Sequence, residues 1–502
     1  MLPDVRAASG LGRLRGVAVD AVKMPRRTNP PRQRAAQRER QSGSHRDSWC
    51  AALPACAGAP CRLAGRGSYL AAGVHPARSR SRSAASFVRS LLQQFRAAAQ
   101  RVCSMTITLR VLGTSVTLLE SLRERAEQEL GIKLVYQIHD VQTAQRIAVM
   151  QPDSYDLYDQ WFHNVDFVWP ARAIQPIDTR RIALWHEIND LPKQGRLRPT
   201  DQPGSGSVPS ERLFVQHDGS LGSAVTERIS MLPLTHNADS FAYRPERLPE
   251  GLSSADESWG WLLDPVWGGR IALQSDAAIG ALDAALAVQG AGLASFKDIG
   301  NMSIEEIDRL ADVLVRKQQQ GHFGAFWSGD EEAAELMLSP DIDIQSLWSP
   351  TLVRLHRAGV KYRVAVPKEG YRGWFGGLSL SRHAKGPVLD AAYAYLNWWL
   401  SGWPGAVMAR QGYYIGNPAR SRDHLSAAEW DYWYAGLPAR EQLLGSDGLP
   451  LIDAGEVRDG GAYEERMGHI AVWNSVMNEH NYLVRRWNDI LRASDKSSAK
   501  AR

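Results

Sequence analysis

The feature that most constrains the fold of this chain is a regular alternation of strand-like and helix-like segments that begins at Thr106. A short apolar run is followed by a turn, Gly113-Thr114-Ser115, and then by leucines at helical spacing from Leu118 to Leu130, with Gly131 as the expected C-cap. The segments of this first unit are a strand (107–112), a helix (118–130), a strand (132–138), a helix (143–150) and a strand (155–158). Such a βαβαβ unit predicts a parallel sheet with right-handed crossovers.

A second alternating unit follows a segment, Asp201 to Ser223, that lacks an apolar period and that we expect to be a loop. Its expected elements are strands at 240–243, 270–273, 323–326 and 362–366, and helices at 259–263, 277–289 and 304–319. After Trp374 we expect one more strand (377–380), a helix (388–400) and an irregular region rich in Trp and Tyr. A chain of 502 residues can bury two substantial cores, so these units predict an α/β protein with two lobes.

The charge of the chain is divided unevenly. Residues 1–104 contain 18 Arg and one Lys against four acidic residues, a local charge of +15, which leaves −10 for the rest. All four cysteines also lie in this leader. Its Arg-, Ser-, Ala- and Pro-rich composition predicts disorder. We expect the leader to come from a misplaced start codon, with Met105 nearer the true start.

Several function classes lack their sequence signals. The arginine run at 78–82 has no interleaved aromatic residues, so we expect no nucleic-acid partner. No apolar stretch of signal-peptide length follows Arg26-Arg27, so an export signal cannot be read. No apolar run of bilayer length occurs. Nucleotide-binding and hydrolase motifs are missing, and the histidines lack acidic residues at ligand spacing, so we expect no catalytic residues, cofactor or metal.

Polar and aromatic residues gather where the predicted strands end. In open α/β sheets, ligands bind outside the carboxyl ends of the strands, where turns and helix N-termini collect polar groups. Aromatic rings with a few carboxylates suit a solute that carries ammonium groups on methylenes. The candidate ligand-binding residues are Thr114, Ser115, Asp159, Gln160, Trp161, Asp276, Trp348, Trp374 and Tyr413. For the rings the alternative is core packing, and Asp276 also suits a helix N-cap.

Four phrases in this order resemble a known family: Gly131-Ile132-Lys133-Leu134; Tyr155-Asp156-Leu157 with Ile174-Gln175-Pro176-Ile177-Asp178; Val366-Pro367-Lys368-Glu369-Gly370 with Trp374; and Gly412-Tyr413 with Asn417-Pro418. They are similar to phrases of the spermidine/putrescine-binding group of extracellular solute-binding proteins (family 1), whose fold is the two-lobed type-2 periplasmic-binding-protein fold. The resemblance implies a periplasmic, monomeric substrate-binding component of an ABC importer. Such a component captures a small polar solute and passes it transiently to a membrane permease.

The resemblance also implies how the lobes are divided. The chain is expected to cross between them near Ala238 to Ala242 and near Trp374 to Gly377. This places residues 105–238 and 375–418 in one lobe and residues 239–374 in the other. We further expect residues 419–493 to form a helical region that packs on the lobes and residues 494–502 to form a disordered tail.

Three departures from the family leave the solute open. Polyamine binders carry acids at the positions of Gly376 and Ile279, and an aromatic residue at the position of Thr114. An amino-acid-derived or organic-acid solute therefore stays an alternative to a polyamine. Two other classes also stay open: a Trp-lined carbohydrate-active enzyme, for which Asp341 and Asp343 would be the acid pair, and a cytoplasmic small-molecule sensor. Solvated turn carboxylates are the favoured interpretation of that pair.

Overall fold

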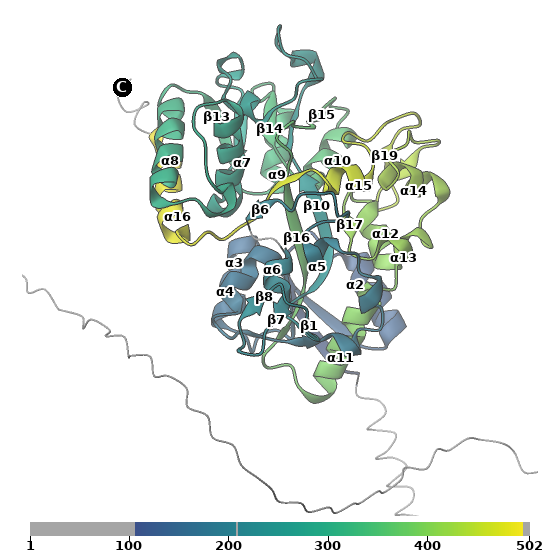
Figure 1. Cartoon of the computed structure of the whole chain (residues 1–502). Helices are drawn as coiled ribbons and strands as arrows, with labels where there is room; N and C mark the ends of the chain where they lie inside the picture. Colours follow the sequence, from purple (N-terminus) through teal and green to yellow (C-terminus); the bar gives the residue numbers. More distant parts are fainter. Residues whose placement is uncertain (1–105, 207–208, 495–502) are drawn as a thin grey trace, which may run out of the picture. The chain divides into compact units, whose positions relative to one another are not determined.

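The computed structural model describes residues 106–206 and 209–494, all of which belong to one compact unit. The leader (1–104) and residues 495–502 of the expected tail lie outside the described residues. Figure 1 shows the course of the chain, with β10 and β16 side by side near its middle. We define two lobes by their sheets: lobe 1 is built on sheet A and lobe 2 on sheet C.

Sheet A has the strand order β17-β10-β16-β3-β1-β2, and β4, β6 and β20 join it through β16 and β20. Its strands are β1 (Thr108–Gly113), β2 (Lys133–Ile138), β3 (Leu157–Trp161), β4 (Ile174–Gln175), β6 (Ser205–Gly206), β10 (Leu232–Asp239), β16 (Tyr371–Ser381), β17 (Tyr414–Ile415) and β20 (Ile470–Trp473). The strand β1 pairs in parallel with both β2 and β3, which confirms the predicted βαβαβ unit.

The helices of lobe 1 are α2 (Glu120–Leu130), α3 (Val141–Met150), α4 (Val165–Val168), α5 (Leu191–Gln194), α6 (Pro209–Leu213) and α11 (Gly386–Trp399). Three of them, α2, α3 and α11, lie where the sequence predicted helices, and α4, α5 and α6 were not predicted. Leu122 and Ala126 of α2 are fully buried in the core that β1 and β3 also line. Gly131 ends α2 in the left-handed conformation with a φ of 64°, as a C-cap glycine should.

Sheet C has the order β13-β12-β14-β11-β15 and a hydrophobic core of its own. Its strands are β11 (Phe241–Tyr243), β12 (Ile271–Gln274), β13 (Phe323–Trp327), β14 (Ile344–Ser346) and β15 (Arg363–Val364), and its helices are α7 (Ala277–Gly290), α8 (Ile304–Gln319), α9 (Asp330–Leu338) and α10 (Ser349–Arg357). The C-terminal helix α16 (His480–Leu491) packs on α7 and α8, as Figure 1 shows for α8. Trp487 of this helix is buried in the lobe 2 core.

The chain passes between the two sheets three times. The first passage is at Ser240, between β10 and β11, inside the segment expected from the sequence. The second lies between Val364 and Tyr371, and the third follows Trp473 on the way to α16. The segment from Trp374 to Gly377, where the second passage was expected, therefore lies inside β16.

Close packing between strands, and not flexibility at a hinge, explains the glycine at position 377 of this segment. Gly377 pairs with Pro233 of β10 and with Gln160 of β3. A Cβ atom at Gly377 would collide with the carbonyl oxygen of Leu232. A glycine in a crowded central strand thus resembles, in sequence, a glycine in a flexible connection.

Two regions hold more structure than their sequences indicated. The segment from Asp201 to Ser223, expected to be a loop, contains α6, β6, β7 (Phe214–Val215) and β8 (Leu221–Gly222). β7 and β8 form a small sheet with β5 (Ile177–Asp178) and β9 (Arg228–Ile229). The region after Trp399 contains α12 (Trp403–Ala409), α13 (Pro418–Arg422), α14 (Ala427–Trp433), β18 (Leu443–Leu444), β19 (Pro450–Ile452) and α15 (Tyr463–Met467), in addition to β17, β20 and α16.

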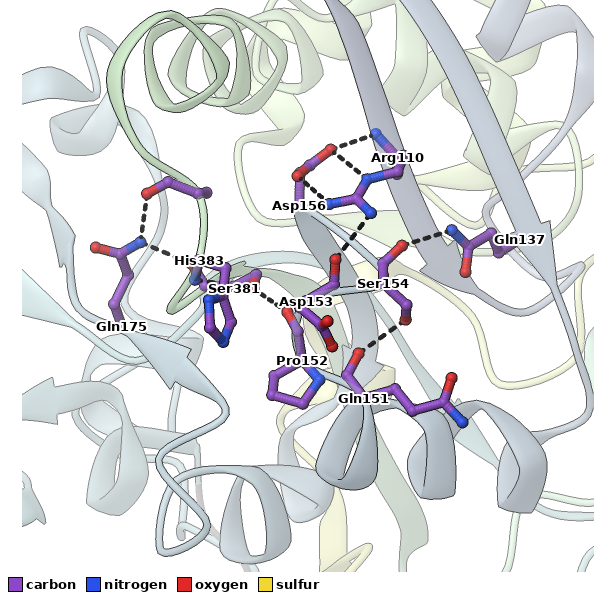
Figure 2. Close-up of polar contacts among 11 residues, drawn as sticks. Arg110, Gln137, Gln151, Pro152, Asp153, Ser154, Asp156, Gln175, Ser381 and His383 are labelled. Atoms are coloured by element: carbon purple, nitrogen blue, oxygen red, sulfur yellow. Dashed lines mark hydrogen bonds and ion pairs between the residues drawn. The ribbon is translucent and has the colours of Figure 1, made fainter.

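Asp156, part of one family-like phrase, anchors the start of β3. Figure 2 shows its carboxylate facing Arg110 of β1, which donates to it from the backbone N–H (2.8 Å), Nε (3.1 Å) and Nη2 (2.8 Å). Arg110 Nη1 also donates to the carbonyl of Asp153. Asp156 therefore ties two neighbouring strands together, away from the strand ends where the candidate ligand residues lie.

Candidate functional site

Three adjoining cavities lie at the contact between the two lobes; two are lined by both lobes and one by lobe 1 alone, and we call them together the interlobe site. The outer cavity, of about 740 Å³, is bordered by α3 of lobe 1 and by the first turn of α7 and α16 of lobe 2. Two inner cavities of about 10 and 20 Å³ share residues with it and with each other. Because each inner cavity has room for about one water molecule, a solute enters this end only when side chains or lobes move apart.

The structure brings together eight of the nine candidate residues. One inner cavity is lined by Thr114, Asp159, Gln160, Trp161 and Trp374. The other is lined by Trp161, Trp348, Trp374 and Tyr413, and the outer cavity by Trp348 and Asp276. Ser115 lies outside all three cavities and is exposed at the turn after β1.

Asp159, Gln160 and Trp161 lie within β3 and not, as expected, after it. Gln160 is buried and donates from Nε2 to Ser379 Oγ at 2.7 Å, across to β16. Thr117 Oγ1 donates to the Asp159 carboxyl group. Burial raises the pKa of Asp159 well above its ordinary value, so this group favours its neutral form and attracts a cation weakly.

The aromatic residues form one wall of the inner end. Trp374 and Tyr413 meet edge to face with ring centroids 5.3 Å apart, and both also pack in the lobe 1 core. Trp348 stands at the N-terminus of α10 and meets Trp327 edge to face at 5.0 Å. Trp374 is 6% exposed, so the cavity reaches a small part of a ring that is otherwise core. Trp374 and Tyr413 therefore pack in the core and line the cavity at the same time.

Asp276 has the capping role that the sequence left open. Its Oδ1 atom accepts from the Ala278 N–H at 2.8 Å at the N-terminus of α7. The same residue lines the outer cavity next to Ala277, Ala278 and Ile279. The carboxylate thus caps the helix and borders the cavity at once.

A buried charged cluster at the inner end was missed by the sequence analysis. Arg372 of β16, 1% exposed, donates from Nε to Asp283 Oδ1 of α7 at 2.7 Å and from Nη1 to Asn474 Oδ1 at 2.9 Å. Its Nη2 atom lies 3.5 Å from Asp239 Oδ2. With both acids ionised, one guanidinium faces two carboxylates, which leaves a formal charge of −1 on these three groups. Three of the four residues, Asp239, Arg372 and Asn474, line the inner cavity beside the aromatic wall.

Asp239 and Asp283 each keep one buried carboxylate oxygen without a hydrogen-bond donor, and of the two only Asp239 lines the inner cavity. In Asp239 this atom is Oδ2. Burial raises the pKa of Asp239 to about 6, and the attraction of Arg372 limits that rise. The sequence did hold a signal for this residue. Asp239 lies inside the segment expected to cross first between the lobes, and residues of a crossing segment border the cleft between them.

The acid pair considered for an enzyme is separated from the interlobe site. Asp343 is buried, not solvated as expected, and its Oδ2 atom lies 2.7 Å from Arg270 Nη1. Asp341 is exposed in the preceding turn. Neither residue lines any of the three cavities.

Comparison with known proteins gives a family and a fold. Residues 188–430 match the family described as bacterial extracellular solute-binding protein. No curated protein matches the chain significantly. Within residues 106–206 and 209–494, no helix is long and apolar enough to cross a membrane.

Three solved structures share the fold at low sequence identity. The spermidine/putrescine ABC transporter substrate-binding protein PotD from Streptococcus pneumoniae has a TM-score of 0.54 and 16% identity, covering 78% of this chain and 100% of that chain. A putative spermidine/putrescine ABC transporter protein from Listeria monocytogenes has a TM-score of 0.53 and 16% identity, covering 77% and 99%. The TpPotD lipoprotein of Treponema pallidum has a TM-score of 0.53 and 12% identity, covering 76% and 99%.

These findings confirm the predicted α/β periplasmic-binding-protein fold, and the family that matches residues 188–430 is one of solute-binding proteins. The family match includes sheet C of lobe 2 and the site residues Asp239, Asp276, Trp348, Trp374 and Tyr413, whereas Thr114, Asp159, Gln160 and Trp161 lie outside it. Over residues 188–430, just under half of its length, the chain is thus similar to bacterial extracellular solute-binding proteins.

Proposed function

We propose that this protein is the substrate-binding component of an ABC importer and that it captures a small amine-bearing, polyamine-like solute in the interlobe site. It then delivers the solute to a permease in the inner membrane, from the periplasm. The extracellular family and the two spermidine/putrescine proteins with the same fold support this proposal.

The observation that carries the proposal is the Asp239 carboxylate beside a wall of aromatic rings: its Oδ2 atom accepts no hydrogen bond, and Arg372, 3.5 Å away, is shared with Asp283. Gln160 Oε1, in the neighbouring inner cavity, is a second buried acceptor without a donor. Buried unpaired acceptors favour a ligand that supplies N–H donors. Contact of an ammonium group with Trp or Tyr contributes about 0.5–2 kcal/mol. A cation with N–H groups satisfies both requirements.

A thermal-shift screen of the full chain tests the solute class. Spermidine, putrescine, amino acids, organic acids and sugars are compared at equal concentration. A ligand at a hundredfold excess over its Kd stabilises the folded state by about 2.7 kcal/mol, so true ligands raise the midpoint clearly. We expect the amines to do so. Stabilisation by organic acids or sugars alone would refute the cationic assignment.

Trp374→Ala is expected to weaken binding of the amine identified in this screen by about 1–3 kcal/mol, because ring contact and cation–π attraction are both lost. Trp374→Phe keeps a ring and should cost less. Isothermal titration calorimetry measures both. The matched control is Trp430→Ala, which removes a partly buried Trp of α14 that borders none of the three cavities. Equal losses in the Trp374→Ala and Trp430→Ala variants would contradict a direct contact.

Binding of the amine should weaken as the pH falls through about 6. The pKa of free Asp239 is about 6, and a bound cation favours the ionised form, which lowers the pKa in the complex. Protons therefore compete with the solute below pH 6, and affinity falls by up to about tenfold per pH unit. Above pH 6 the affinity should not change with pH. Calorimetry from pH 5 to 8 measures this slope, and the Asp239→Asn variant should lose it. An unchanged slope in that variant would assign the titration to another group.

A further inference from the structure

A second cavity, of about 700 Å³, lies behind the interlobe site. Ser349 and Gly412 line it, whereas their chain neighbours Trp348 and Tyr413 line the inner end of the interlobe site. One wall comes from α10 and β15 of lobe 2, and the other from the C-terminal region between Tyr432 and Arg466. Its volume is within the range of small-molecule sites.

Two arginines on the wall of this cavity have no carboxylate partner in the described part of the chain. Arg458 donates to the carbonyls of Trp433 (2.8 Å) and Gly412 (2.7 Å), and its guanidinium lies 4.7 Å from the ring centre of Tyr414. Arg466, 5% exposed, donates to the carbonyls of Asp459 (2.7 Å) and Ala238 (2.8 Å). Carbonyls and rings thus hold both side chains in place; the charge of Arg466 is partly balanced by Asp239 and Asp459, whereas the partners of Arg458 are carbonyls and aromatic rings.

The buried polar atoms left without partners on this wall are all donors. They are Gln411 Nε2, Trp433 Nε1 and Arg466 Nε. In the interlobe site, by contrast, Gln160 Oε1 and Asp239 Oδ2 are acceptors that receive no hydrogen bond. A buried donor without an acceptor is costly, so the second cavity favours a ligand rich in acceptors.

We propose that this cavity is a second binding site and that it takes a small carboxylate with an apolar or aromatic body. The planar guanidinium groups of Arg458 and Arg466 suit a carboxylate, which accepts two parallel hydrogen bonds. The ligand body packs on the apolar and aromatic part of the wall, formed by Leu352, Val353, Tyr362, Tyr432 and Trp433.

Other charges on the wall limit the ligand to one negative group. Arg363 is already paired with Glu257 (2.7 Å) and Asp459 (3.3 Å). Asp453 and Glu456 also line the cavity, and with His356 they bring potential ligand atoms within 4.8 Å of one another. These acids repel a polyanion, so a monocarboxylate fits better than a nucleotide or citrate.

Calorimetric titration of the full chain with benzoate and phenylacetate tests this site, with acetate and citrate as comparisons at constant ionic strength. We expect saturable binding of the aromatic carboxylates, and at least tenfold weaker binding of acetate, which lacks the body, and of citrate, which has three charges. Arg458→Gln should weaken benzoate binding at least tenfold. Arg458→Lys keeps the charge but loses the planar fork, so it should retain part of the affinity.

The matched control is Arg354→Gln, which removes an exposed arginine of α10 that pairs with Glu331. This variant should bind benzoate as the parent does. If Arg458→Gln does not fold, Gln411→Leu provides an independent test, because it removes one unpaired donor of the wall. No saturable binding of either aromatic carboxylate would overturn the proposal. Equal binding in the wall variants and in Arg354→Gln would overturn it too.

Discussion

Replacing Arg372 by leucine is expected to lower the free energy of unfolding by about 3–5 kcal/mol, because it leaves Asp239 and Asp283 buried without their counter-charge. Arg372 is 1% exposed, and it joins β16 of lobe 1 to α7 of lobe 2 through its 2.7 Å contact with Asp283. Asp283 is fully buried, and burial raises its pKa although Arg372 attracts the ionised form. Removing the guanidinium therefore removes the group that makes two buried carboxylates tolerable.

Urea denaturation at neutral pH measures this loss. The control is Arg354→Leu, whose surface pair should contribute less than about 1 kcal/mol. A double variant, Arg372→Leu with Asp283→Leu, should recover part of the loss, because it also removes one of the stranded charges. A change below about 1 kcal/mol in Arg372→Leu would mean that the cluster is not isolated from water as the structure has it.

Asp239→Asn is expected to weaken binding of the amine solute by about 2–5 kcal/mol, the cost of removing one partner from a desolvated charge pair. The substitution keeps the shape of the side chain but removes the charge that balances the bound ammonium group. It also replaces one of the two carboxylate oxygens by an NH2 group, which donates hydrogen bonds instead of accepting them. The loss should exceed that of Trp374→Ala, because charge contributes more than ring contact in a site shielded from water.

Calorimetry at pH 7.5 measures the affinity, and urea denaturation checks that the variant stays folded. Asp341→Asn is the matched control, since Asp341 is exposed and borders none of the three interlobe cavities. An affinity within twofold of the parent, in a folded Asp239→Asn variant, would refute a contact between Asp239 and a cation. The site would then have to accommodate a neutral or anionic solute.

The sequence alone determined the elements whose signals are local. The helix expected at 304–319 is α8, and the helix expected at 277–289 is α7 less one residue. For α8 the signal is the period of its apolar face, whereas α7 is a continuous apolar segment that is buried on nearly all sides. The strand-end positions and the resemblance to a family also led to nine candidate residues, of which eight line the interlobe site.

Only the tertiary structure decided which of these positions are charged, unpaired or crowded. Asp239, Asp283 and Arg372 come from β10, α7 and β16, so no spacing in the sequence relates them. Gly377 was expected at a crossing, yet it lies in a central strand against the Leu232 carbonyl. The second cavity likewise has walls from segments that are far apart in the sequence, since Arg458 and residues of α10 both line it. Burial and ion pairing are properties of several segments packed together, whereas helix and strand periods belong to one segment, which is why a sequence specifies the second kind more directly than the first.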